Sequence, residues 1–318
     1  MASAGDLTLL EIMRRFSTEE AARAYFERAR WPNGPVCPHC GNAQADRIYS
    51  VTPNAKARVR VGLYKCGECR DTFTVTVGTV MEDSHVPLHK WLVAFYMMCA
   101  SKTQVSALQL QRQLEIGSYR TALFLCHRIR FALKEVGAVP KLSGEVEADE
   151  TYVGGRARGK GQGYTKNKTA VVSLVEKGGS VRSTVVENVS QKTMGALLHE
   201  HVEANAHLNT DESALYKKAG KDFASHETFN HSKEEYVRRD EESGRVVTTN
   251  TVKGFFGNTK RSIDGTHHQV SRKHLHLYVA ELDFKYNTRT VTDGQRTNTG
   301  IRGIEGKRLM MHRPKSAV

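Results

Sequence analysis

The spacing of apolar residues changes period three times along the chain. Residues 1–36 have a helical pattern, in which Ser17 and Glu20 show capping-box spacing and Phe16 precedes the cap. Pro32 then interrupts the pattern. We therefore expect an N-terminal helical segment over 1–36.

Residues 37–80 follow the two-residue period of strands instead. Apolar residues alternate with polar or small ones in two runs, namely Val59, Val61 and Leu63, then Phe73, Val75 and Val77. This alternation predicts short antiparallel strands.

Residues 81–140 return to helical periodicity, with helices expected over Ser106–Leu114 and Tyr119–Leu133. The break at 116–118 contains glycine, and two short helices around such a turn match a helix-turn-helix. An ordinary amphipathic bundle is the alternative that the pattern leaves open. If the second helix reads DNA, its basic residues are its contacts, chiefly to phosphate; they are Arg120, Arg128 and Arg130.

Residues 141–290 mix strands and helices. Strands are predicted over 144–153, 168–177 and 180–189, a helix from Lys192 to about Val202, and a short strand over 206–210. This order favours an RNase H-like mixed sheet flanked by helices. The tail, 291–318, is basic and weakly periodic, so we expect an extended arm. The whole is predicted to be a multidomain α+β and α/β chain.

Charge adds a partner to this picture. The 318 residues include 47 Lys and Arg against 34 Asp and Glu, a net charge of +13. Such an excess favours double-stranded DNA as partner, although a basic enzyme without nucleic acid has the same balance. The sequence lacks an apolar stretch of about 20 residues and a signal-peptide h-region, so we expect no membrane association and a cytoplasmic location.

Four of the six cysteines form two CxxC pairs separated by 25 residues: Cys37, Cys40, Cys66 and Cys69. Four thiolates close a tetrahedral shell around Zn²⁺ and leave no position for a catalytic water, which predicts a structural zinc ribbon. Gly41 and Gly67 stand where tight knuckle turns need a positive φ. The ribbon either contacts DNA or supports the helices behind it. Cys99 and Cys126 lie in apolar stretches and are predicted core residues.

Two aspartates follow or lie in predicted strands. In the first strand, alternation places Glu145, Glu147 and Asp149 on one face and Glu150 on the other, while Asp211 ends the short fourth strand. Carboxylates at strand ends suit the two cations that phosphoryl transfer commonly uses. Taken alone, either aspartate also fits a surface or capping role.

Three segments together resemble bacterial insertion-sequence transposases that join a zinc ribbon to a DDE-type, ISXO2-like domain. They are GEVEADETYVGG (144–155), TDE (210–212) and NTVKGFFGNTKRSIDGTHHQVSRKHLHLYVAELDFKYNTR (250–289), and the similarity runs from Cys37 to about Arg308. The resemblance implies an RNase H-like fold, catalytic Mg²⁺ or Mn²⁺, cleavage at transposon ends and strand transfer into target DNA. It matches Asp149 and Asp211 to the first two catalytic aspartates. Bringing two ends together also implies a homodimer or larger assembly at the nucleoid.

The third catalytic position departs from the family pattern. Lys260 matches the lysine that the family carries, and seven residues earlier, where a glutamate is usual, this chain has Lys253. An ammonium cannot ligate Mg²⁺ and repels it. Either another group such as Asn250 or Asn258 holds the second metal, or the chain is an impaired, transposase-derived DNA-binding protein. A zinc-ribbon nuclease without strand transfer is a third reading.

Other basic residues are candidate DNA contacts. The glycine-rich run 154–168 has five cations and no acid, which suits either phosphate contact or a solvated loop. The candidates outside the helix-turn-helix are Arg156, Arg158, Lys160, Lys260 and Arg261.

Overall fold

The computed structural model describes most of the chain in two compact units. The first unit comprises Met1–Lys134 together with Thr290–Val318, and the second comprises Glu135–Arg289. The described residues are 7–56, 59–135, 139–155, 167–229, 237–239 and 246–310.

The first unit begins with two helices, α1 (Leu9–Arg15) and α2 (Glu19–Arg30). Thr18 caps α2 by accepting the N–H of Ala21 at 3.2 Å. The expected capping box at Ser17 and Glu20 is therefore wrong. The chain forms a capping box one helix earlier, where the Thr8 hydroxyl accepts the N–H of Glu11 and the Glu11 carboxylate accepts the N–H of Thr8.

The zinc-ribbon segment follows α2. After a 3-10 turn, η1 (Ala45–Arg47), three short strands form an antiparallel sheet in the order β1-β2-β3: β1 (Ile48–Ser50), β2 (Tyr64–Cys66) and β3 (Thr72–Phe73). The strands are shorter than the alternation predicts, because Val59 makes only an isolated bridge and Val61 is 47% exposed. Trp31 packs edge-on against Tyr64 and Phe73, with ring centroids 5.8 Å apart in each pair.

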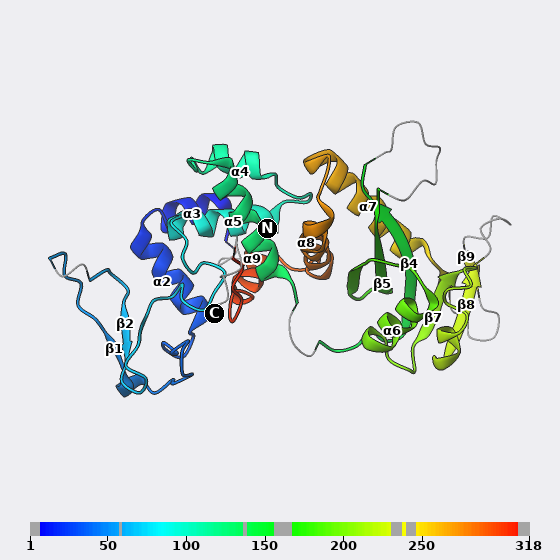
Figure 1. Cartoon of the computed structure of the whole chain (residues 1–318), viewed down its shortest axis with the longest axis horizontal. Helices are drawn as coiled ribbons and strands as arrows, with labels where there is room; N and C mark the ends of the chain where they lie inside the picture. Colours follow the sequence, from blue (N-terminus) through cyan, green and yellow to red (C-terminus); the bar gives the residue numbers. More distant parts are fainter. Residues whose placement is uncertain are drawn as a thin grey trace, which may run out of the picture. The chain divides into compact units, whose positions relative to one another are not determined.

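Three further helices continue the first unit: α3 (Leu88–Ala100), α4 (Ala107–Gln113) and α5 (Tyr119–Leu133). The residues that return after the second unit form α9 (Asp293–Arg302), which packs on α3, α2 and α5 (Figure 1). The expectation of an extended arm is wrong for this segment. A Thr292–Gln295 capping box starts α9, and the buried Ile301 and Ile304 attach it to the core.

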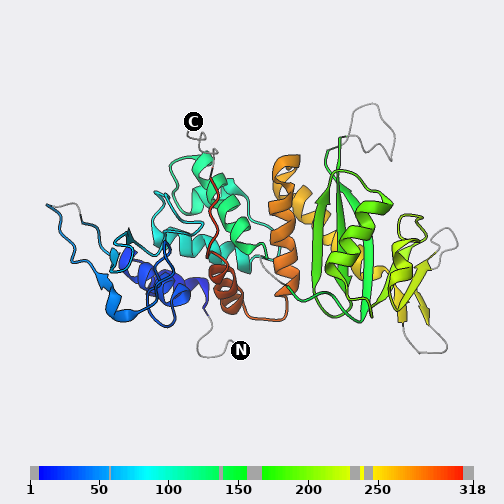
Figure 2. The same cartoon turned by 60° about the horizontal axis from the view of Figure 1, so that its bottom comes forward.

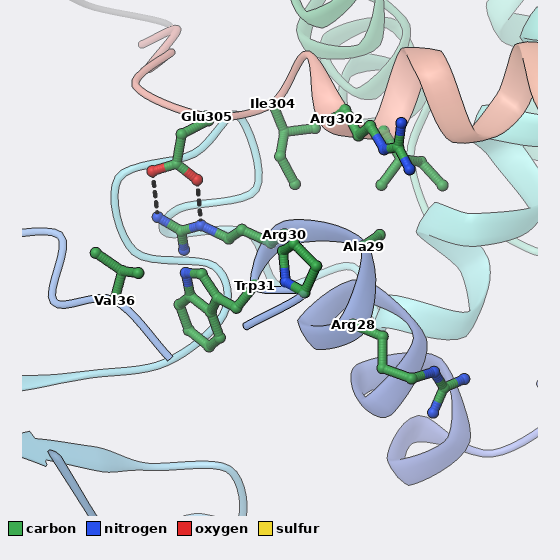
Figure 3. Close-up of a pocket in the computed structure, with 10 residues that line it drawn as sticks. Arg28, Ala29, Arg30, Trp31, Val36, Arg302, Ile304 and Glu305 are labelled. Atoms are coloured by element: carbon green, nitrogen blue, oxygen red, sulfur yellow. Dashed lines mark hydrogen bonds and ion pairs between the residues drawn. The ribbon is translucent and has the colours of Figure 1, made fainter. Parts of the chain in front are cut away.

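Arg30 joins three parts of this unit. Its guanidinium donates to the Val75 carbonyl at 2.8 Å and, by a second nitrogen, to the Glu305 carboxylate at 2.9 Å. It also lies over the Trp31 ring, 4.9 Å from the centroid. Figure 3 shows the paired bonds to Glu305 above the indole, in a pocket that Arg28 and Arg302 also line. The arginine therefore ties α2 to the ribbon and to the segment after α9.

The second unit is built on a five-stranded sheet with order β6-β5-β4-β7-β8. Its strands are β4 (Glu145–Val153), β5 (Thr169–Glu176), β6 (Val181–Val186), β7 (His207–Asp211) and β8 (Ser225–Phe229). β4, β5 and β6 pair antiparallel, whereas β7 pairs parallel with both β4 and β8. A short antiparallel pair, β9 (Val237–Arg239) and β10 (Val246–Thr248), and a 3-10 turn, η2 (Ala219–Asp222), complete the described β-region.

Helices cover both faces of the sheet (Figure 2). Val146 and Ala148 face a core formed with α6 (Gln191–His201). Val171 and Val175 face α7 (Asn250–His267) and, after the turn η4 (Arg272–His274), α8 (Leu275–Asn287). This arrangement confirms the predicted mixed α/β class and is consistent with an RNase H-like fold. Among the described helices, none combines the length and apolar character needed to span a bilayer.

Replacing Arg30 with lysine should destabilise the first unit, because an ammonium cannot reproduce the forked bonds to Glu305 and Val75. The expected loss is about 1.5–3 kcal/mol in the free energy of unfolding. Both tryptophans of the chain, Trp31 and Trp91, lie in this unit, so urea unfolding followed by tryptophan fluorescence reports on it.

Arg28→Lys is the matched control, because Arg28 is an exposed neighbour on the same helix. An Arg30→Lys midpoint equal to that of the control would contradict the role given to Arg30.

Candidate zinc and catalytic sites

The four CxxC cysteines come together at one point of the ribbon. All four sulfur atoms lie within 4.8 Å of one another. Cys37 and Cys66 are buried, and the Sγ of Cys37 lies 3.6 Å from that of Cys69. Four converging thiols, which form a complete ligand set among the described residues, fit a closed, structural Zn²⁺ site.

Backbone groups act on the thiols of this cluster in different ways, and burial and neighbouring thiols raise the pKa of Cys40 and Cys69. The N–H of Cys69 is the main cause that lowers the pKa of the Cys66 thiol to about 6, against the opposing effect of burial. Gly41, directly after Cys40, has φ 76°, as expected. In the second knuckle the positive φ falls on Arg70, directly after Cys69, and not on Gly67. Gly67 has a different role, because a Cβ there would lie 3.1 Å from the Arg47 carbonyl.

The two helices of the helix-turn-helix candidate lie within a residue of their predicted bounds. The residues exposed on the second helix, α5, differ from those predicted to contact DNA. α5 begins after Ser118, whose hydroxyl accepts the N–H of Thr121 at 3.1 Å, and the turn's positive φ lies at Glu115. The exposed residues of α5 are those of its first turn, among them Tyr119 and Arg120.

Two predicted DNA contacts on α5 are wrong. Arg130 is 1% exposed and donates to the Val105 carbonyl, and Arg128 is 8% exposed with its guanidinium over the Phe124 ring. Both guanidiniums are buried in the helical core and interact with residues of that core, so they do not face a phosphate at the surface. Three other predicted contacts, Arg156, Arg158 and Lys160, lie outside the described residues.

In the second unit, β4 and β7 bring the two predicted aspartates side by side. The parallel register pairs Glu145 with His207 and Glu147 with Asn209. Continued past these pairs, the same offset of 62 residues places Asp149 beside Asp211, whose charge acts on it. Each carboxylate accepts one backbone N–H, Asp149 from Glu150 at 2.8 Å and Asp211 from Ser213 at 3.0 Å. Residues 212–218 form no helix, so Asp211 is not a helix cap.

Burial and neighbouring charge set the protonation of Asp149. Burial raises the pKa of its carboxyl to about 7, and the charges of Glu150 and Asp211 act in the same direction, while Lys253 opposes them. The pKa of Glu150 is also raised, first by burial, and its carboxylate accepts the Tyr216 hydroxyl at 2.7 Å. This Glu150–Tyr216 pair was not predicted, because no spacing in the sequence links residues 66 apart.

α7 carries the basic side of the site. Lys253 lies in its first turn, half-buried, where its charge acts on Asp149, and Lys260 lies two turns further on and is exposed. Asn250 is the exposed first residue of α7. Asn258 is already engaged, since its side-chain oxygen accepts from Arg261 at 2.6 Å.

The donors around the aspartates fit one hard divalent cation better than two. Asp149 and Asp211 each keep a carboxylate oxygen with no hydrogen bond in the described part of the chain. Mg²⁺ is commonly held by one or two carboxylates, with water and phosphate oxygens completing the octahedron. Among the described residues, only the four cysteines form a cluster of three or more metal-ligating side chains. At the position of Lys253 the chain brings a positive charge beside Asp149 in place of a further ligand.

Comparison with known families agrees with both sites. Residues 141–287 match the model of the ISXO2-like transposase domain, and residues 17–72 match that of the transposase zinc-ribbon domain. The two matches together give the chain the domains of an ISXO2-like transposase. The first match contains both aspartates and Lys253, and the second contains all four cysteines of this transposase.

Two individual proteins similar to the chain share 29% and 15% sequence identity with it. An uncharacterized protein in transposable element ISH50 of Halobacterium salinarum is 29% identical over 291 residues, covering 86% of the transposase and 92% of the relative. A chain from the cryo-EM structure of the simian T-cell lymphotropic virus intasome with PP2A regulatory subunit B56 gamma is 15% identical. That match covers 56% of the transposase and 63% of the viral-complex chain, at a TM-score of 0.28. Such a score is too low for a comparison of sites.

Cys66→Ser should remove zinc from the transposase and unfold the ribbon, because a hydroxyl is a poor ligand for Zn²⁺ beside three thiolates. Elemental analysis of the purified chain should fall from about one zinc to less than half. Cys99→Ser is the control, since Cys99 is buried in α3 away from the cluster. Unchanged zinc content in Cys66→Ser would contradict a four-cysteine site.

Proposed function

We propose that this transposase cleaves DNA at the ends of its element and joins those ends to target DNA. The single observation that carries the proposal is the pair of aspartates held level on neighbouring parallel strands, each with one oxygen available to a cation. Asp149 and Asp211 would hold Mg²⁺ or Mn²⁺. Such a cation activates a water or a 3′-hydroxyl and stabilises negative charge on the phosphate.

The protein's own residues would bind and orient the phosphodiester. Lys253 and Lys260 are seven residues apart, so they project from one face of α7 with roughly 10 Å between them along the axis. We assign Lys253 to the phosphate next to Asp149 and Lys260 to the neighbouring backbone. The positive charge of Lys253 also offsets the repulsion among Asp149, Glu150 and Asp211, which burial strengthens.

Each unit has its own proposed DNA contacts. In the first unit it is the exposed first turn of α5, with Arg120, because the N-terminal residues of a recognition helix meet base edges. In the second unit it is Lys260 and Arg261 on α7, both exposed. The net charge of +13 supports contact with a polyanion. Because transposition brings two ends together, the active form is proposed to be a dimer or larger assembly.

A second candidate function is a DNA-binding protein that has lost catalysis, such as a repressor. Lys253 favours it, because this residue brings a cation to the position where the family usually has a metal-binding glutamate. The two functions share the zinc ribbon and the DNA surface, so only a chemical assay separates them.

Duplex DNA carrying the element's own ends should be cleaved by the natural protein with Mg²⁺ or Mn²⁺. Asp149→Ala and Asp211→Ala should each reduce the rate by about 1,000-fold or more, since each removes a ligand to the cation. Cleavage is measured on end-labelled duplex at fixed salt, with binding measured in parallel to show that the variants still hold DNA.

Asp264→Ala provides the matched control, because Asp264 is an exposed carboxylate on α7. Lys253→Glu tests the rival function. If the natural chain binds the ends without cutting and only Lys253→Glu cuts, the protein is a DNA binder that has lost its transposase chemistry.

A further inference from the structure

A third carboxylate of β4 is buried beneath α7. Glu147 lies two residues before Asp149 on the same face of the strand and is 0% exposed. Its two carboxylate oxygens accept separate hydrogen bonds from the start of α7. Oε1 accepts from the Thr251 hydroxyl at 2.8 Å, and Oε2 accepts from the backbone N–H of Val252 at 2.8 Å.

These bonds add to the cap of α7, where the Thr248 hydroxyl accepts the N–H of Asn250 at 3.0 Å. The first N–H groups of a helix have no partner within it and are usually satisfied by a side chain at the N-cap. Thr249, at the N-cap of α7, makes no such bond. Glu147 supplies the acceptor from a different element instead, and its negative charge is favourable at a helix N-terminus.

Packing alone does not account for a glutamate here. Val171 and Val175, on the same face of the sheet, pack against α7 through apolar contacts alone. Removing a carboxylate from water is costly, and burial accordingly raises the pKa of Glu147. Two hydrogen bonds to neighbouring residues of one helical turn offset the cost of burying this carboxylate. Together they restrict both the translation and the rotation of that turn.

The residue after Val252 is Lys253. An anchor on Thr251 and Val252 therefore fixes the turn from which Lys253 extends beside Asp149. We propose that Glu147 is a positioning residue that locks the first turn of α7 onto β4, so that Lys253 is held beside Asp149 and Lys260 at a set distance from both aspartates. The effect of this lock on catalysis rests on the proposed function, whereas the lock itself does not.

The experiment uses Glu147→Gln in the full, zinc-loaded chain. Glutamine has nearly the same volume, but its amide nitrogen cannot accept a hydrogen bond, so one of the two donors of α7 loses its partner. Thr251→Val removes one donor while keeping the shape of the side chain. Glu145→Gln is the control, because Glu145 lies on the same face of β4 and its carboxylate bonds Lys177 at 2.6 Å.

The first readout is acylation of Lys253 measured by mass spectrometry without DNA, with the exposed Lys260 as internal reference. Glu147→Gln should raise the rate ratio of Lys253 to Lys260 by about 10-fold, and Thr251→Val should raise it less. Amide hydrogen exchange over residues 250–256 should accelerate in the same order, while that of α8 should not change. Glu145→Gln should match the natural chain in both measurements.

The second readout separates positioning from simple loss of stability. In Glu147→Gln the cleavage rate on bound end DNA should fall by about 10–100-fold, while the Kd for that DNA changes less than twofold. Unchanged Lys253 reactivity and exchange in both Glu147→Gln and Thr251→Val would overturn the proposal. If those quantities change but the natural chain never cleaves DNA, the lock stands and the proposed catalytic function fails.

Discussion

The parallel pairing of β4 with β7 is the constraint on which the rest of the second unit depends. Backbone hydrogen bonds fix the offset between the strands, and that offset alone sets Asp149 level with Asp211. Two carboxylates held this way repel each other, and burial strengthens the repulsion because solvent screens it less. Burial is the main cause that raises the pKa of Asp149 to about 7, and the charges of Glu150 and Asp211 act in the same direction. Three neighbouring features interact with this concentration of negative charge. Lys253 lies beside it, Tyr216 donates to Glu150, and the protein leaves two carboxylate oxygens for a cation.

The first unit depends on interactions of another kind. Its ribbon has only three short strands, too few to form a stable core, and four cysteines at one point replace that core with metal coordination. Arg30 then joins the ribbon to α2 and to the segment after α9. The first unit is made from both ends of the chain, Met1–Lys134 and Thr290–Val318, and the five-stranded sheet lies in the segment between them, Glu135–Arg289.

The sequence predicted the catalytic unit well because its signals are local. Each strand of the sheet from β4 to β7 alternates or is continuously apolar, and α6 has clear caps, so these elements lie within a few residues of their predicted bounds. The cysteine cluster follows from spacing alone. The registration of Asp149 with Asp211 could not be predicted from periodicity, since it depends on which strands are neighbours; the family resemblance supplied that pairing.

The errors have physical causes as well. Arg128 and Arg130 are basic, but α5 is covered by α3, α4 and α9, so its basic residues are buried with it. α9 carries few apolar residues, and its attachment depends on a core formed by residues about 200 positions earlier. The role of Glu147 depends on contacts with residues 104 and 105 positions away. No single-sequence pattern contains that information.

Joining of DNA ends to a target tests the central claim most directly. Pre-cleaved end duplex, supercoiled plasmid and Mn²⁺ are incubated with the natural protein, and the junctions are sequenced. The account predicts that the 3′ ends of the element become covalently joined to the plasmid, and that Asp211→Asn abolishes the junctions. Binding of the ends, or their hydrolysis, with no junctions in the natural protein would contradict a transposase and leave a DNA-binding protein or a nuclease.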